Sequence, residues 1–263
     1  MNAVISIAKT TIGEAIRRRV LLVILLIGVL FLVIAPGLSV LSARQNYTVL
    51  TSFTLGIIQL TSAVIAIVLT VYLLPNEVER RTIYTILSKP VYRWHFLLGK
   101  YLGAVGALAM MMLLMSTVLV LVFKLMQKDA SMDDVMRLAT APIFFFVQMS
   151  LLAAVAMFFS TFVSPIVNIF LSGGVYLVGT LFSPVFQDLS NNKSLSPAVK
   201  GAATLVHTVV PNFAQYNIQG GIINRGPELR SVELYYATIV GYAIIYITVF
   251  LIAGMMIFDR KEV

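Results

Sequence analysis

Residues 20–41 read VLLVILLIGVLFLVIAPGLSVL, an apolar run that contains no charged side chain. A helix needs roughly 20 apolar residues to cross the hydrocarbon layer of a membrane, and this run is long enough. Five further uncharged runs of similar length lie at about 53–74, 101–123, 141–162, 165–187 and 235–258. The sequence therefore predicts an all-α integral membrane protein with six transmembrane helices and a single transmembrane domain over residues 1–263.

The composition excludes a water-soluble domain. Of the 263 residues, 59% are hydrophobic and 11% are charged, and the mean hydropathy is +0.95, values typical of membrane chains. The absence of cysteine from the sequence excludes a disulfide framework, thiolate catalysis and cysteine-ligated metals. The net charge of +8 is what lysine and arginine retained on the cytoplasmic side would give, so we do not expect nucleic acid as a partner.

The distribution of positive charge predicts the orientation. Eleven of the nineteen lysines and arginines lie on the side of the six runs that holds both termini, and positive residues near span ends resist translocation. We therefore expect both termini in the cytoplasm. A cleavable signal peptide is the alternative reading of residues 20–41, because small residues follow the apolar run, but its positive region would be unusually long.

The residues before the first span predict an interfacial helix. Residues 1–19 carry charged side chains on one part of the helical wheel and apolar ones on another. The apolar positions are Ile5, Ala8, Ile12 and Ile16. Such a helix is expected to lie in the membrane interface.

A second short helix is expected between spans two and three, in the stretch NEVERRTIYTILSKPVYRWHFLLGK at 76–100. Asn76 is a good N-cap, Glu79 stands at the capping-box position and Pro90 disfavours further helix. The helix is too short to span, so segment 75–100 should lie along the cytoplasmic surface. It is then either a solvated loop that carries positive charge or a docking element for a soluble partner. Gly99 and Gly103 have a G-x-x-x-G spacing that allows close helix contact.

This segment resembles the coupling region of permease subunits of type-2 ATP-binding-cassette (ABC) exporters. The resemblance rests on Glu79-Arg80-x-Thr82, Leu87, Pro90, Arg93 and Gly99-Lys100, and the branch most similar contains the permease that serves nitrous oxide reductase maturation. It implies a bacterial inner-membrane protein in which a coupling helix seats in a groove of a separate ABC ATPase. It also implies pairing of two permeases, as a homodimer or with a homologue. The residues expected to dock the ATPase are Asn76, Glu77, Glu79, Arg80, Arg81, Thr82, Leu87, Lys89, Pro90 and Arg93.

No catalytic or nucleotide-binding motif is expected to act in this chain. Leu171-Ser172-Gly173-Gly174 copies part of the ABC ATPase signature, but it lies within an apolar run, and the sequence has no G-x-x-x-x-G-K-[ST] phosphate loop. Small residues there are better explained as a helix-packing surface. ATP and Mg²⁺ would therefore be bound by the partner ATPase. An intramembrane enzyme has no paired carboxylates or nucleophile and base to support it.

We also predict no metal site. A methionine cluster can hold Cu(I), and this chain has one at Met110, Met111, Met112 and Met115. Consecutive residues on a helix point in different directions, however, so apolar filling is the commoner role. His95 and His207 lie far apart in the sequence, without the spacing of metal ligands.

Four polar residues in the apolar runs are candidates for lining a pathway. They are Gln59, Ser62, Gln148 and Asn168. Their alternative and more usual role is hydrogen bonding between helices. The runs contain no aspartate, glutamate, lysine, arginine or histidine, which argues against a proton-coupled carrier.

The insertion at 188–234 is expected to lie outside the membrane. Ser196-Pro197 predicts a helix start, and Pro211-Asn212 predicts its end. This insertion would cap a pathway, meet a periplasmic partner or simply connect two spans. Two functions are left open: export of an unidentified substrate driven by the partner ATPase, or transmission of force to periplasmic partners without solute transport.

Overall fold

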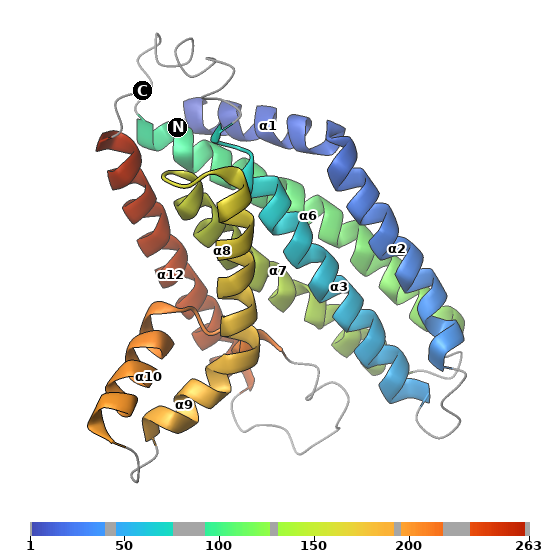
Figure 1. Cartoon of the computed structure of the whole chain (residues 1–263). Coiled ribbons are helices and arrows are strands. Elements are labelled where there is room, and N and C mark those ends of the chain that lie inside the picture. Colours follow the sequence, from blue (N-terminus) through green and yellow to red (C-terminus); the bar gives the residue numbers. More distant parts are fainter. Residues whose placement is uncertain are drawn as a thin grey trace.

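The computed structural model describes residues 2–39, 46–75, 93–126, 131–191, 196–217 and 232–260. Within these ranges every regular element is a helix, and six helices are long and apolar enough to cross a membrane (Figure 1). The predicted all-α architecture with six spans is confirmed. The spans are α2 (Arg19–Ser39), α3 (Asn46–Val71), α6 (Arg93–Met126), α7 (Met132–Ser160), α8 (Pro165–Leu177) with its continuation, and α12 (Val232–Arg260). The continuation of α8 is a short π-helix, η1 (Val178–Phe182), followed by α9 (Ser183–Asn191).

Helix α7 is the centre of the bundle. It packs against α3, α6, α8 and α12, and Leu151 to Met157 form an unbroken buried stretch. Three alanines in this stretch, Ala153, Ala154 and Ala156, are essentially inaccessible. Lipid tails are as apolar as leucine, so helices in a membrane associate through close packing, which small side chains permit.

Helices α2, α8 and α12 form the periphery. Each exposes large apolar side chains, such as Leu26 on α2, Phe170 on α8 and Ile245 on α12. In a water-soluble protein these side chains would form a large apolar surface, which monomers rarely expose. Their exposure is consistent with helices that face lipid or another membrane chain.

Helix α1 (Asn2–Arg17) lies across one end of the bundle and meets α2 at an angle (Figure 1). The C-terminal end of α12 lies at this same end. The predicted apolar face of α1 is divided in the structure. Ile12 packs on α6 at Gly106, whereas Ile5 and Ile16 are 49% and 43% exposed.

The elements between α8 and α12 lie at the opposite end of the bundle (Figure 1). Helix α10 (Pro197–Val209) packs against α9 and is followed by a 3-10 turn, η2 (Ala214–Tyr216). Ser196 is the N-cap and Pro197 the first helical residue, because proline at that position loses no helical hydrogen bond.

Candidate functional site

The site that the sequence predicts is the connection between α3 and α6. Nine of its ten docking residues lie outside the described residues, namely Asn76, Glu77, Glu79, Arg80, Arg81, Thr82, Leu87, Lys89 and Pro90. The structure does describe the two ends that this segment joins. At the α3 end, Leu73 and Leu74 are buried, and at the α6 end the first residue is Arg93.

Arg93 holds the start of α6 against the end of α12. Its Nη1 donates hydrogen bonds to the backbone oxygens of Phe258 and Asp259, each at 3.1 Å. The last carbonyls of a helix lack intrahelical partners and carry partial negative charge, which a guanidinium complements. The rings of Phe96 and Phe258 stack beside this contact, with centroids 6.3 Å apart. Arg93 therefore joins two spans at the membrane end that flanks residues 76–92.

Three glycines of α6 bring α1 into close contact. A Cβ atom at Gly99 would lie 2.8 Å from the Cβ of Ile7, and one at Gly103 would lie 2.5 Å from the Cβ of Thr11. Gly106 meets Ile12 in the same way. The close approach expected from the glycine spacing is present, and its partner is α1 rather than another span.

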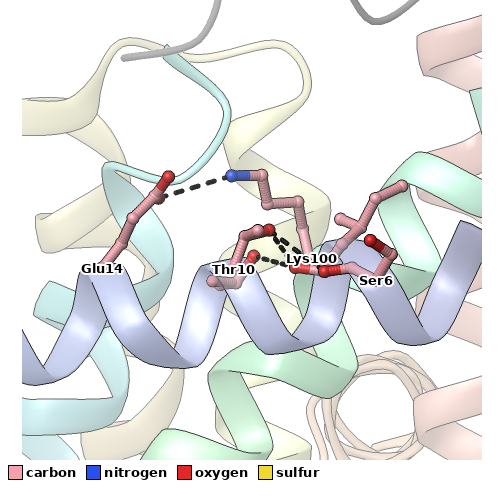
Figure 2. A network of polar contacts seen from close by, with 6 residues as sticks. Ser6, Thr10, Glu14 and Lys100 are labelled. Atoms are coloured by element: carbon pink, nitrogen blue, oxygen red, sulfur yellow. Dashed lines mark hydrogen bonds and ion pairs between the residues drawn. The ribbon is translucent and has the colours of Figure 1, made fainter.

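A buried lysine adds an ion pair to this contact. Lys100 of α6 is only 3% exposed, and its Nζ lies 3.6 Å from Oε2 of Glu14 on α1 (Figure 2). The ammonium group also lies 5.8 Å from the centroid of the Phe96 ring, within the range of a cation–π contact. Figure 2 shows Thr10 and Ser6 on the same side of α1 as Glu14. In the sequence, Lys100 contributes to the cytoplasmic positive charge and to the coupling-region motif, and nothing in its spacing points to Glu14.

Loss of the Glu14 carboxylate should destabilise the junction. We expect Glu14→Gln to lower the free energy of unfolding by about 2 kcal/mol, because it removes the carboxylate that lies 3.6 Å from the buried ammonium group of Lys100. Thermal unfolding of the purified protein in mild detergent measures the effect. Adding Lys100→Met removes the buried positive charge and should recover most of the loss; a double variant as unstable as the single one would contradict the ion-pair explanation.

Two of the predicted pathway residues meet in the middle of the bundle. Gln59 of α3 donates from Nε2 to Oε1 of Gln148 on α7 at 3.2 Å. Gln148 in turn donates from Nε2 to the backbone oxygen of Phe213 at 3.0 Å, and it is fully buried. These residues therefore connect α3, α7 and the segment before α12.

The other two pathway candidates lie apart from this pair. Asn168 of α8 donates from Nδ2 to the backbone oxygen of Ala156 on α7 at 2.9 Å and accepts a hydrogen bond from Ser172 at 2.7 Å. The hydroxyl of Ser62 donates to the backbone of its own helix, at Ile58. In the structure, both side chains bond to groups of this same chain.

The segment after α10 turns into the bundle. Phe213 is fully buried, and its backbone N–H donates to the oxygen of Gly179 in η1 at 2.9 Å. The ring of Phe213 packs on Tyr176 with centroids 5.6 Å apart. Gly179 permits this contact because any side chain there would collide with Pro211 and Phe213. The sequence predicts the helix break at Pro211-Asn212 but gives no sign that the next residues are buried.

Tyrosines hold this segment to α12. The Tyr242 hydroxyl accepts a hydrogen bond from the backbone N–H of Asn212 at 2.9 Å, and the Tyr246 hydroxyl donates to the backbone oxygen of Thr208 at 2.8 Å. From the other side, the Tyr216 hydroxyl donates to the backbone oxygen of Ile239 at 3.3 Å. Burial raises the pKa of the Tyr216 phenol, so this group keeps the proton that it donates.

The remaining motifs occupy packing positions. Met111, Met112 and Met115 belong to the buried core, whereas Met110 is exposed. In the part of the chain that the structure describes, no three histidine, aspartate or glutamate side chains are grouped closely enough to hold a metal. A Cβ atom at Gly173 or Gly174 would meet nothing within 4 Å, so none of the described residues packs against α8 at these two positions.

Comparison with known proteins places the chain in a family. A protein-family model described as "ABC-2 family transporter protein" matches residues 5–263, which is almost the whole chain. No curated protein gives a match to this sequence.

Proposed function

This chain belongs to the ABC-2 transporter family, and we propose that it couples ATP hydrolysis by a separate ABC ATPase to export of a substrate across a bacterial cytoplasmic membrane. Family membership makes the chain a multi-pass transmembrane subunit of an ABC transporter, and it implies an ABC ATPase as partner in general. Our proposal adds that the complex exports a substrate and that residues 76–92 transmit the movement of the ATPase to the spans.

The observation that carries the proposal is the anchoring of both ends of residues 76–92. Arg93 bonds to the end of α12, and the next turns of α6 hold α1 through the glycine contacts and the pair of Lys100 with Glu14. At the other end, α3 packs along α7. A push on residues 76–92 would therefore move α3 and α6, and α6 would carry α1 and α12 with it.

We assign the docking contacts to the polar side chains of this segment, with Glu79, Arg80, Arg81 and Lys89 as the main ones. Ile83, Ile86 and Leu87 would pack against the ATPase groove or the membrane. ATP binding would close the ATPase pair, and the displacement would switch the spans between two rigid packings. ATP and Mg²⁺ would be held by the ATPase alone, and both termini of this chain would lie in the cytoplasm.

Two permeases would pair above two ATPase subunits, either two copies of this chain or one copy and a homologue. Within the family, the residues from Glu79 to Lys100 support the branch that contains the permease for nitrous oxide reductase maturation. Size determination of the purified complex tests the pairing.

Reversal of two charges in the segment should uncouple the ATPase. We expect Arg80→Glu combined with Arg81→Glu to weaken ATPase binding by about ten-fold or more, because like charges then face each other across the interface. Co-purification from mild detergent and stimulation of ATP hydrolysis measure binding and coupling.

The matched control reverses two charges at the opposite end of the bundle. Arg137→Glu combined with Lys200→Glu makes the same change in net charge and should leave ATPase binding and stimulation unaltered. Unchanged stimulation of ATP hydrolysis by the Arg80→Glu, Arg81→Glu variant would contradict the assignment of these residues to the docking contact.

A specific observation also favours the second candidate, transmission of force without solute transport. Gln59, Gln148 and Asn168 hydrogen-bond to one another or to the backbone of this chain, which leaves them less able to contact a solute. Helices α9 and α10 would then contact a periplasmic partner. A structure of the paired chain with its ATPase decides between the two: a continuous cavity between the permeases supports export, and a closed, tightly packed interface supports force transmission.

A further inference from the structure

A groove runs between α6 and α7 on the outside of the bundle. Its volume is about 670 Å³, and its lining includes Met112, Ser116, Val120 and Lys124 of α6 and Pro142 and Phe146 of α7. We call it the α6/α7 groove. Pockets for small ligands are typically about 300–1,000 Å³. The groove lies along the second half of α6, away from the end at which Arg93 begins the helix and α1 crosses the bundle.

The walls of the groove are apolar along most of its length. Thr117 also lines it, but its hydroxyl donates to the backbone oxygen of Leu113 at 2.8 Å, so this hydrogen-bond donor is already used. The groove opens on the surface of two membrane-spanning helices. An occupant therefore needs a long apolar part that can enter from the hydrocarbon layer.

The end of the groove is positively charged. Lys124 lies in the last turn of α6, and among the residues that the structure describes none forms an ion pair with it. A lysine near the end of a span extends its ammonium group to the headgroup layer. There it attracts anionic lipids.

We infer that the α6/α7 groove binds a phospholipid with a net negative headgroup. One acyl chain lies in the groove between Met112 and Phe146, and the phosphate binds the ammonium group of Lys124. The inference requires only that the helices span a membrane, so it stands independently of the proposed export function.

Fluorescence quenching by brominated lipids tests this binding in the full chain. The sequence contains a single tryptophan, Trp94, so Trp94→Phe gives a background without that fluorophore. Phe146→Trp then places a reporter in the groove, and Phe31→Trp places a matched one on the exposed face of α2. Each protein is reconstituted into vesicles that contain brominated phosphatidylglycerol or brominated phosphatidylcholine.

At position 146 we expect phosphatidylglycerol to bind about five-fold more tightly than phosphatidylcholine, the preference that one lysine gives at a membrane surface. At position 31 the two lipids should quench equally. Lys124→Gln should reduce the ratio at position 146 to about one while quenching by phosphatidylcholine persists. Equal quenching at position 146 with Lys124 intact would mean bulk lipid only, and absence of quenching would mean that another chain covers the groove; either result overturns the inference.

Discussion

Gly103→Leu should detach α1 from α6 and cause the largest loss of stability that we expect. The first atom of the new side chain would lie 2.5 Å from the Cβ of Thr11 and 2.8 Å from the backbone oxygen of Ala8. Backbone atoms cannot move aside without displacing the whole helix. Overpacking a close contact costs about 1–3 kcal/mol even for small additions. We therefore expect leucine at position 103 to lower the free energy of unfolding by about 3 kcal/mol or more.

The displacement can be measured directly because the chain contains no cysteine. Ala15→Cys places a single thiol at a position of α1 that is 1% exposed. A water-soluble maleimide should react with it slowly in the parent protein and quickly after Gly103→Leu, and the melting temperature in detergent should fall.

The matched control is Gly173→Leu, which adds the same side chain where a Cβ atom meets nothing within 4 Å. It should leave both the labelling rate and the melting temperature close to those of the parent. Slow labelling of the Gly103→Leu protein would show that α1 does not depend on this contact.

The second strong effect is expected at Gly179. Its replacement by alanine would place a methyl group against the backbone oxygen of Pro211 and 2.6 Å from the Phe213 ring. Residues 211–213 would have to move. This movement breaks the hydrogen bond from the Phe213 N–H to the Gly179 oxygen and leaves the buried amide of Gln148 without its acceptor, the Phe213 oxygen. We expect Gly179→Ala to lower the free energy of unfolding by about 3 kcal/mol, because overpacking and an unsatisfied polar group both destabilise the fold.

Gly174→Ala is the control, because it lies in the preceding helix α8 and a Cβ atom there has open space. Alanine is favoured over glycine within a helix by roughly 0.5–1 kcal/mol, so this variant should melt at the same temperature or higher. Opposite shifts of the two melting temperatures are expected in detergent. Similar shifts would show that residues 211–213 do not depend on the glycine.

The six spans were predictable because a membrane imposes a local rule. Backbone groups in hydrocarbon must bond within their own segment, so each span is a helix whose length and hydropathy appear in a continuous run of sequence. The same locality predicted α1 from its amphipathic pattern and the start of α10 from Ser196-Pro197. The docking assignments at residues 76–92 stay predictions, since they lie outside the described residues.

The sequence by itself thus determined that the chain crosses a membrane six times and where each crossing lies. Only the tertiary structure decided which segments meet: that α1 is the partner of the α6 glycines, that Lys100 is buried against Glu14, and that Phe213 enters the core. The physical reason is the range of the forces involved. Hydropathy and helix capping depend on neighbours in the sequence. The hydrogen bond between Gln59 and Gln148, in contrast, joins residues 89 positions apart and depends on how whole helices pack.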